Sequence, residues 1–441
     1  MQNNTSTVIK ALSGPLKGKT SVPGDKSISH RAVLFSAMAE GVSEISGLLD
    51  SADVLSSVRV VEQLGAQVSL KRQADKSLSA TIKGWGSAGP QQPDDPLDCG
   101  NSGTTARLLM GLCAPWDIEA TITGDASLLE RPMRRITAPL MKMGVRFSPE
   151  GQEHLPITIK GTKKLKAIDY QAPMASAQLK TAVLLAGVFA QGTTVLTEPS
   201  RSRNHTELML PEYGVTTTAS ELRSSVTGPQ NMCATHIYVP GDPSSAAFIV
   251  CAAVLKEGST IEIEGVSLNT ARTGFIRTLE RMGADISVRN TGSEGKEPYG
   301  TIQVRYDGVL RGCEVPADKI PSLIDEVPVL SLVAAFSRGL TVFRGVDELR
   351  HKEADRLRAI VEGLGSMGVD AWLEGADLFI EGQPGLEIPH DLVFNSQKDH
   401  RLAMTWALVG FSGKQSIEVK DFDSVKISYP RFLQDIERLS L

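Results

Sequence analysis

Cations and hydroxyls with a spacing suited to anion binding stand close together in the stretch VPGDKSISHR, residues 22–31. Asp25 or Ser27 can cap a helix here, because a short polar side chain satisfies backbone N–H groups that lack partners at a helix start. If Ser27 opens the helix, Arg31 follows four residues later on the same face. A helix N-terminus beside Lys26 and Arg31 suits a phosphate or a carboxylate, and a capped helix with solvated charges is the alternative.

Further stretches of the first half place polar or cationic groups at expected helix starts and loops. CGNSGTTAR has Asn101, Ser102 and Gly103 ahead of a helix, where a glycine lets backbone N–H groups approach an anion closely. PMASAQ sets Ser176 and Gln178 at the next helix start, where capping is the alternative. A solvated face would account for at least two arginines of ERPMRR, and RSRNHTE is expected to form a loop. These two stretches contribute Arg131, Arg134, Arg135, Arg201 and Arg203.

In the second half, carboxylates stand beside cations. IDEVPVL sets Asp325 and Glu326 directly before an apolar helix, so helix capping competes with a chemical role. KDHRLAM puts His400 and Arg401 at another helix start. The same alternative, helix capping, applies at this second helix start.

The stretch ELRHKEADRLRA adds two more cations. Lys352 and Arg356 are four residues apart, so we expect them on one helical face, with Glu353 and Asp355 between them. A surface ladder of salt bridges is the alternative interpretation of this helix.

Composition and spacing exclude several classes of function. A net charge of −5 over 441 residues gives no general field for nucleic acid or anionic membrane. The seven histidines show no metal-ligand spacing and there is no GxxxxGK[ST] loop, so we expect neither metal nor cofactor. Five scattered cysteines indicate free thiols in a reducing compartment. With no signal-peptide pattern and no apolar run of membrane-spanning length, we expect a cytoplasmic protein.

A repeat organises the chain. VPGDKSISHRAVLFSAMAEG at residues 22–41 has a gap-free partner, VPGDPSSAAFIVCAAVLKEG, at residues 239–258. Lys26 and Arg31 of the first copy become Pro243 and Phe248 in the second. Because the second copy keeps the scaffold without these charges, the charges are not expected to be needed for folding.

The wider pattern is an α/β unit that occurs six times: an apolar helix, an alternating strand, a second helix, then a glycine and another strand. The sixth unit lacks its closing strand, and we expect the chain's start, TSTVIKALSG, to supply it. Three units per half then predict two domains, one of residues 1–20 plus 241–441 and one of residues 21–240.

Taken in order, DKSISHR, GNSGTTAR, ERPMRR, PMASAQ, DELRHKEADRL and DHRLAM closely resemble the motifs of 5-enolpyruvylshikimate-3-phosphate synthases. The resemblance covers essentially the whole chain. It implies an α/β, two-domain enolpyruvyl transferase fold of six βαβαββ-type units, three per domain, which closes around the substrates. It also implies a transferase of aromatic amino acid biosynthesis. Such an enzyme moves the enolpyruvyl group of phosphoenolpyruvate to the 5-hydroxyl of shikimate-3-phosphate and releases phosphate.

The resemblance also implies roles for individual residues. Ala177 stands where many members have serine, so one hydroxyl contact becomes a backbone contact or is lost. Shikimate-3-phosphate would contact Lys26, Ser27, Arg31, Ser176, Ala177, Gln178, Arg203, Asp325 and Lys352. Phosphoenolpyruvate would contact Lys26, Asn101, Gly103, Arg131, Gln178, Arg356 and Arg401.

For the chemistry, the resemblance implies addition and elimination through a tetrahedral ketal phosphate. Asp325 would take the 5-hydroxyl proton and Glu353 would protonate the methylene carbon, with Lys26 and His400 able to share these transfers. A further phosphate-binding lysine of the family stands about a residue out of register with Lys426 in VKISYPRF.

PMASAQ and SRNHTE resemble the variety of the family in which glyphosate-tolerant members are found. Tolerant relatives carry alanine where this chain has Gly103, so we expect glyphosate to inhibit. One alternative is an enolpyruvyl transferase acting on UDP-N-acetylglucosamine, which usually has a cysteine shortly before the ERPM-like arginine; GDASLLERP has none. Another is a non-catalytic anion-binding paralogue, which would be expected to lose Asp325 or Glu353. We expect a monomer, because the chain closes its own repeats.

Overall fold

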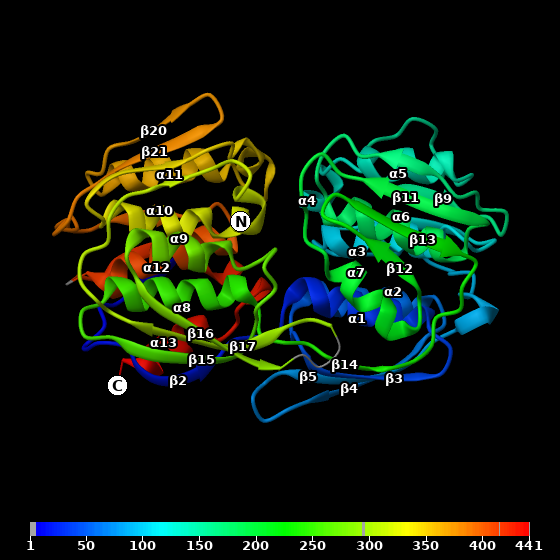
Figure 1. Ribbon diagram of the computed structural model, residues 1–441, viewed down its shortest axis with the longest axis horizontal. Helices are drawn as coiled ribbons and strands as arrows, with labels where there is room; N and C mark the ends of the chain where they lie inside the picture. Colours follow the sequence, from blue (N-terminus) through cyan, green and yellow to red (C-terminus); the bar gives the residue numbers. More distant parts are fainter. Residues whose placement is uncertain (1–5, 293–295, 414, 441) are drawn as a thin grey trace. The chain divides into compact units, whose positions relative to one another are not determined.

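The computed structural model describes residues 6–292, 296–413 and 415–440, and the chain divides into two compact units (Figure 1). Unit 1 consists of Met1–Pro23, Gly241–Gly292 and Pro298–Leu441. Unit 2 consists of Gly24–Pro240 and Ser293–Glu297. The chain thus returns briefly to unit 2 near Glu297, a crossing that the repeat pattern does not predict.

Unit 2 contains three four-stranded sheets, in the orders β14-β3-β5-β4, β6-β7-β9-β8 and β10-β11-β13-β12. In each sheet the first two strands are parallel and the remaining pairings are antiparallel. The strands are β3 (Val42–Leu48), β4 (Gln67–Arg72), β5 (Leu78–Lys83), β6 (Leu97–Asp98), β7 (Glu119–Thr123), β8 (Arg146–Ser148), β9 (Ile157–Lys160), β10 (Asp169–Gln171), β11 (Gly192–Thr197), β12 (Thr217–Ala219), β13 (Arg223–Gly228) and β14 (His236–Tyr238).

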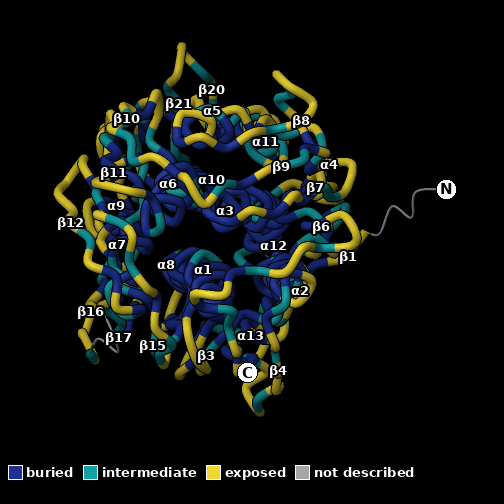
Figure 2. Tube along the Cα trace, turned by 90° about the vertical axis from the view of Figure 1, so that its right-hand side faces the viewer, coloured by how far each residue is buried: buried dark blue, intermediate teal, exposed yellow. Residues whose placement is uncertain are grey.

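Three central helices of unit 2 are buried on almost every side, as Figure 2 shows in dark blue: α1 (Lys26–Met38), α3 (Gly103–Cys113) and α6 (Ala177–Phe189). These helices therefore form the centre of the core, and polar residues such as His30 and Arg31 are buried with them. The α3–α6 contact is so close that a Cβ on Gly111 would lie 2.4 Å from the Ala182 carbonyl oxygen. The outer helices are α2 (Ala52–Gln63), α4 (Ala126–Leu129), α5 (Arg134–Lys142) and α7 (His205–Met209).

Unit 1 has two four-stranded sheets, in the orders β16-β17-β15-β2 and β18-β19-β21-β20, and a three-stranded sheet, β1-β23-β22. As in unit 2, each sheet has one parallel pair: β15 with β2, β18 with β19 and β22 with β23. Among the described residues the chain therefore has six sheets, which agrees with the six predicted units. The strands are β1 (Ser6–Ile9), β2 (Lys17–Ser21), β15 (Thr260–Ser267), β16 (Asp285–Gly292), β17 (Tyr299–Arg305), β18 (Glu314–Val315), β19 (Gly339–Phe343), β20 (Ala371–Glu374), β21 (Asp377–Gly382), β22 (Val393–Asn395) and β23 (Ile417–Lys420).

The central helices of unit 1 are α8 (Pro243–Leu255), α10 (Val327–Ala335) and α12 (His400–Ser412), which contact one another in the core. The outer helices are α9 (Gly274–Met282), α11 (Arg356–Ser366) and α13 (Phe432–Leu439). Short 3₁₀ segments precede α10 and α11 and follow β23: η4 (Ile324–Glu326), η5 (Asp347–His351) and η6 (Phe422–Ile427).

The chain's start closes the sixth unit, as predicted. Strand β1 pairs antiparallel with β23, with Ser6 opposite Lys420 and Ile9 opposite Ile417. Of the predicted stretch TSTVIKALSG, residues 6–14 are described. No described helix is both long and apolar enough to cross a lipid bilayer.

Candidate active site

The start of α1 is capped by Asp25, which settles the alternative between Asp25 and Ser27. The Asp25 carboxylate accepts a hydrogen bond of 2.8 Å from the Ile28 backbone N–H. Lys26 then occupies the first helical position and pairs with Asp53 of α2 at 2.5 Å. Lys26 therefore lies at a positive helix N-terminus, and its amine is held by a buried carboxylate.

Arg31 is a buried cation, only 2% exposed. Its guanidinium donates to the hydroxyls of Thr206 at 3.0 Å and Thr181 at 2.8 Å, and to the Ser27 carbonyl at 2.9 Å. Burial lowers the pKa of Arg31 to about 10, and the nearby cation of Arg203 acts in the same direction. The hydrogen-bond partners of this guanidinium are neutral, while the carboxylates of Glu207 and Asp25 oppose the fall of its pKa.

At the start of α3, a glycine stands between two arginines. Ser102 caps the helix through the Thr105 N–H at 3.1 Å, and Gly103 is the first helical residue. Arg131 donates to the Asn101 side-chain oxygen at 2.9 Å. A Cβ on Gly103 would lie 2.8 Å from Nη1 of Arg107 and 3.4 Å from Nη1 of Arg131. Any side chain at residue 103 would therefore press on the two guanidinium groups beside this helix start.

The start of α6 brings its polar residues against α3. Ser176 caps the helix through the Leu179 N–H at 3.3 Å, and Ala177 and Gln178 follow in the first turn. The Gln178 amide donates to Thr104 at 3.0 Å, and its oxygen accepts from Arg107 at 3.1 Å and Arg135 at 3.0 Å. Gln178 thus joins the two helix starts that were predicted separately.

Arg107 and Arg135 were not among the residues predicted for the site. Arg107 ends the quoted motif CGNSGTTAR, four residues after Gly103 and so on its face, a signal that helical spacing could have supplied. The solvated-face interpretation of ERPMRR holds for Arg134, which is exposed and pairs with Glu153, but Arg135 bonds to Gln178.

Beneath Ser176, a buried lysine is held by two carboxylates, and neither the lysine nor the carboxylates were predicted. Lys180 is 3% exposed and lies 2.8 Å from both Glu198 and Glu207. Glu198 also accepts from the Ser176 backbone N–H at 3.0 Å. The network fixes the turn that leads into α6, so it positions Ser176 without being exposed itself.

A second buried network joins α1, α2 and α3. Nδ1 of His30 lies 2.8 Å from the Ser57 hydroxyl, and the Ser57 hydroxyl lies 2.8 Å from the Thr105 hydroxyl. The Thr105 hydroxyl in turn donates to the Ser102 hydroxyl at 2.7 Å. Burial lowers the pKa of His30 to about 3, and the charge of Lys26 contributes in the same direction. His30 is therefore neutral at physiological pH and connects the helix starts without adding charge.

In unit 1, three carboxylates surround one buried arginine. Arg356, 1% exposed, lies 2.7 Å from Asp399, 2.8 Å from Glu353 and 3.1 Å from Asp325. Burial alone would lower the pKa of Arg356, but Asp399, Glu353 and Asp325 together raise it. Asp325 does not cap α10, since no side chain caps that helix. Capping therefore does not explain the carboxylate, and its pairing with Arg356 leaves a chemical role open.

The predicted common helical face of Lys352 and Arg356 is wrong. Asp355 caps α11 through the Arg358 N–H at 3.1 Å, so the helix begins at Arg356, and Lys352 has extended backbone before it. Lys352 nevertheless lies 3.9 Å from Asp325 and 2.7 Å from Glu348. The short polar side chain of Asp355 competes for the backbone and stops the helix from extending to Lys352.

Helix α12 begins at His400, as predicted, and is capped by Asp399. Arg401 in its first turn lies 3.7 Å from the Asp325 carboxylate and donates to the Asp325 carbonyl oxygen at 3.3 Å. Lys426 lies apart from these contacts: it is largely exposed in η6, and its ion-pair partner among the described residues is Asp423 at 2.6 Å.

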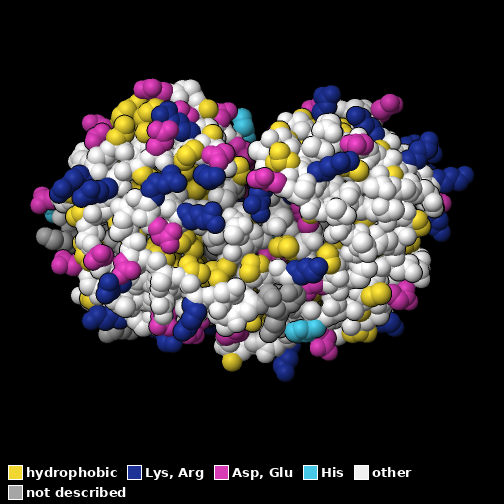
Figure 3. All heavy atoms as spheres, in the orientation of Figure 1, with side chains coloured by type: hydrophobic (Ala, Val, Ile, Leu, Met, Phe, Trp, Pro, Cys, Tyr) yellow, Lys and Arg dark blue, Asp and Glu magenta, His cyan; other side chains and the backbone are white. Residues whose placement is uncertain are grey.

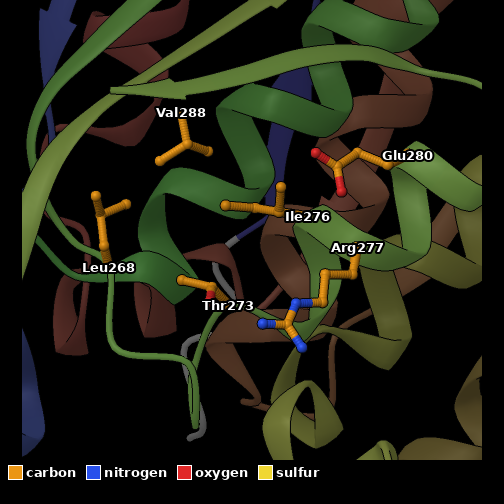
Figure 4. A pocket seen from close by; sticks show the side chains of 6 residues that line it. All are labelled: Leu268, Thr273, Ile276, Arg277, Glu280 and Val288. Atoms are coloured by element: carbon orange, nitrogen blue, oxygen red, sulfur yellow. The ribbon is translucent and has the colours of Figure 1, made fainter. Parts of the chain in front are cut away.

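In the described part of the chain, neither of two surface hollows is lined by a predicted site residue; one of them is bordered by Arg59, Glu62, Gln63 and Asp98. A hollow of about 160 Å³ lies over α9 and β16 in unit 1, lined by the six side chains in Figure 4, and none of the predicted site residues lines it. Cations and carboxylates are intermingled on the face shown in Figure 3. Among the described residues, no group of three or more histidine, cysteine or acidic side chains could hold a metal ion.

Comparison with known proteins places the chain. The family model described as EPSP synthase (3-phosphoshikimate 1-carboxyvinyltransferase) matches residues 11–436. The chain belongs to the EPSP synthase family. A 3-phosphoshikimate 1-carboxyvinyltransferase of Gluconobacter oxydans is 44% identical, covering 98% of this chain and 97% of the relative. One from Bacillus pumilus is 40% identical, covering 97% of this chain and 98% of the relative.

Solved structures agree with membership of the EPSP synthase family. An EPSP synthase from Acinetobacter baumannii superposes with a TM-score of 0.89 at 38% identity, covering 98% of both chains. The enolpyruvyl transferase NikO from Streptomyces tendae has a TM-score of 0.79 at 17% identity, covering 99% of this chain and 98% of that one. The latter similarity concerns the fold, and together they confirm the two-domain α/β enolpyruvyl transferase architecture.

Proposed function

We propose that this chain transfers the enolpyruvyl group of phosphoenolpyruvate to the 5-hydroxyl of shikimate-3-phosphate and releases phosphate. The observation that carries the proposal is the set of cations at the helix starts of a chain that belongs to the EPSP synthase family. Lys26, Arg356 and Arg401 lie in the first turns of α1, α11 and α12. Arg31 bonds to Ser27 at the start of α1, and Arg131 bonds to Asn101 just before α3. Each of the two substrates carries one phosphate and one carboxylate, and cations at helix starts are well suited to bind such anionic groups.

The proposed contacts with shikimate-3-phosphate come mainly from unit 2. Arg31 is held ready by Thr181 and Thr206, and Ser176 and Gln178 share the start of α6. The full proposed set is Lys26, Ser27, Arg31, Ser176, Ala177, Gln178, Arg203, Asp325 and Lys352.

For phosphoenolpyruvate, the proposed contacts are Lys26, Asn101, Gly103, Arg131, Gln178, Arg356 and Arg401. The surroundings of Gly103 support this assignment, since the guanidinium groups of Arg107 and Arg131 both border the position that a Cβ would take. An incoming carboxylate or phosphate must share Arg356 with three carboxylates of the chain, so its binding weakens those internal pairs.

The proposed chemistry is addition followed by elimination. Asp325 accepts the proton of the 5-hydroxyl while the hydroxyl oxygen forms a bond to C2 of phosphoenolpyruvate. Glu353 delivers a proton to C3, and the product of this addition is a tetrahedral ketal phosphate. In elimination, the C2–O bond to phosphate breaks and a proton leaves C3 for Glu353, which restores the double bond in the enol ether. Lys26 and His400 are further candidates for these proton transfers. Arginines at the helix starts stabilise charge on the departing phosphate.

The experiment mixes the purified chain with phosphoenolpyruvate and either shikimate-3-phosphate or UDP-N-acetylglucosamine, and follows phosphate release. We expect release with shikimate-3-phosphate alone. Release with only the UDP sugar would overturn the acceptor, and a folded chain silent with both would indicate a non-catalytic anion-binding protein. Lys160→Met, whose pair with Glu119 is exposed and lies outside the proposed site, is the control that should keep activity, whereas Asp325→Ala should lose it.

We further propose that the chain belongs to the variety of the family that includes glyphosate-tolerant members and that it is nevertheless inhibited by glyphosate. Gly103 supports the proposed inhibition, because an added Cβ would approach Arg107 and Arg131 and reduce the space for an anionic inhibitor. In a competition assay against phosphoenolpyruvate, Gly103→Ala should weaken glyphosate inhibition more than it raises the KM for phosphoenolpyruvate. A wild-type enzyme that ignores a large excess of glyphosate would contradict the proposal.

We also propose that the protein acts as a cytoplasmic monomer. The pairing of β1 with β23 supports the monomer, because the chain completes its own sixth sheet without a second copy. Sedimentation equilibrium should give the mass of one chain, 47.3 kDa.

A further inference from the structure

The two VPGD motifs start helices of equal length, α1 and α8, and both carry a serine at the second helical position. Ser27 in the first motif is a proposed substrate contact. Ser244 occupies the same place in the second motif and is 2% exposed. Its hydroxyl donates a short hydrogen bond to Oε1 of Glu326. The second motif therefore holds an anion, and this anion is a side chain of the protein itself.

A cation accompanies each serine, but its origin differs. In the first motif the helix supplies Lys26, which pairs with Asp53 of α2. In the second motif proline replaces this lysine, and Arg272, in the loop before α9, supplies the charge. Nη2 of Arg272 lies 2.9 Å from both the Asp242 carboxylate and the Ser244 hydroxyl. The loss of the lysine from the second copy is thus compensated locally.

Glu326 connects this buried arrangement to a proposed substrate contact. It is 1% exposed, and its Oε1 accepts from Nη1 of Arg401 at 3.4 Å as well as from Ser244. Arg401 has a second acceptor in the backbone carbonyl of Asp325. Burial raises the pKa of Glu326, whereas the charges of Arg401 and Arg272 oppose that rise. Donors therefore approach one oxygen of Glu326 from two helices, α8 and α12.

We propose that Glu326 is the internal ligand of the second VPGD motif and that, anchored there by Ser244 and Arg272, it positions Arg401 for phosphoenolpyruvate. The inference rests on the proposed function, which assigns Arg401 to that substrate. Glu326 acts through Arg401 and is a positioning residue. The duplicated motif thus binds substrate in one copy and orients a substrate-binding side chain in the other.

The test compares Glu326→Gln and Ser244→Ala with wild type in separate titrations of the two substrates. Glu326→Gln removes a charge-assisted acceptor without changing side-chain size, so the KM for phosphoenolpyruvate should rise about ten-fold. The kcat should fall less than the KM rises. The contact between Arg401 and phosphoenolpyruvate is present in both the ground state and the transition state, so weakening it affects mainly binding. Ser244→Ala, which loosens the anchor alone, should give a smaller rise of the same kind. Binding of shikimate-3-phosphate, measured by calorimetry, should be unchanged.

Matched controls separate positioning from a general loss of packing. Asp435→Asn alters a buried carboxylate of α13 that pairs with Arg431 and Arg438, and Ser331→Ala removes a buried hydroxyl that bonds within α10. Both should leave the KM for phosphoenolpyruvate unchanged. An active wild type with the same KM in Glu326→Gln and Ser244→Ala, or an equal rise in the controls, would overturn the assignment. A wild type inactive with both substrates would overturn the proposed function and the assignment with it.

Discussion

Buried cations at the residue scale are compensated in two different ways. Lys180 and Arg356 are each surrounded by carboxylates, two in the first case and three in the second. Arg31 is held by threonine hydroxyls and a backbone carbonyl. Lys180 fixes the start of α6 and has no proposed ligand, whereas Arg31 can attract an anion directly. Arg356 is proposed to bind one by giving up part of its internal pairing.

Lys180→Met should destabilise the protein strongly, because it leaves Glu198 and Glu207 buried without their common cation. Removing one partner of a buried ion pair costs about 3–5 kcal/mol. Urea denaturation should therefore show a large fall in the unfolding midpoint. The double variant Lys180→Met/Glu198→Gln should recover part of that loss; no recovery would show that packing, and not charge, dominates.

His30 should make the stability depend on pH. Its pKa is lowered to about 3 in the folded protein from an unfolded value of 6.5, so the unfolded chain binds more protons between these values. Stability is then complete above pH 6.5 and falls as the pH decreases, by up to about 1.4 kcal/mol per pH unit. His30→Asn should show a shallower acid limb in denaturation measured from pH 7 to pH 4. Parallel limbs would contradict the burial of a neutral imidazole.

Sequence patterns located the residues that carry distinctive chemistry but not those that support them. Lys26 and Arg31 stand out because the second motif lacks them, and Arg356 stands out within a charged stretch. Lys180 gave no such signal: it lies inside an apolar helix, and its partners Glu198 and Glu207 come from other segments. Contacts between segments distant in sequence depend on tertiary packing, which local spacing does not encode.

At the scale of elements, the duplicated VPGD turn is explained by the backbone. In unit 2 the Asp25 N–H donates to the Pro240 carbonyl, and in unit 1 the Asp242 N–H donates to the Pro23 carbonyl. Each motif thus supplies an acceptor for the other's helix cap. The repeat and its helices were predictable, but the start of α11 was not. In the sequence, an aspartate that caps a helix looks the same as one that forms a salt bridge inside it, and Asp355 is the cap.

Two glycine substitutions should have opposite effects. In Gly24→Ala the new Cβ would lie 2.0 Å from the Gly47 carbonyl oxygen, so the VPGD turn must shift, at a cost of about 3 kcal/mol. In Gly365→Ala, inside α11, the Cβ meets nothing within 4 Å, so the helix should gain about 0.5–1 kcal/mol. Thermal melting of both variants measures the difference. A Gly24→Ala protein that melts like wild type would contradict the tight packing of the turn.

At the scale of the whole molecule, the proposed substrate contacts divide between the units. Arg31 and Ser176 belong to unit 2, while Asp325, Glu353 and Arg356 belong to unit 1. Six copies of one plan were recognisable from the sequence because helix and strand periods alternate regularly. The return of the chain to unit 2 near Glu297 was not, because it follows no repeat; there Glu297 lies 2.5 Å from His205.

This division predicts that binding and chemistry can be separated by substitution. Arg31→Met should weaken calorimetric binding of shikimate-3-phosphate, since it removes a cation from unit 2. Glu353→Gln should leave that binding intact and lower turnover by about 10²–10⁴-fold, the usual loss of a general acid. Loss of both properties in each variant would contradict the division of roles.

The most direct test follows the enolpyruvyl group of phosphoenolpyruvate into the product, because phosphate release alone could also come from hydrolysis. Phosphoenolpyruvate labelled with ¹³C at C2 is incubated with shikimate-3-phosphate and the chain, and the product is identified by NMR. The proposed transfer predicts an enol ether carbon joined to the 5-oxygen of shikimate-3-phosphate, with one phosphate released per product. Labelled pyruvate with unchanged shikimate-3-phosphate would contradict it.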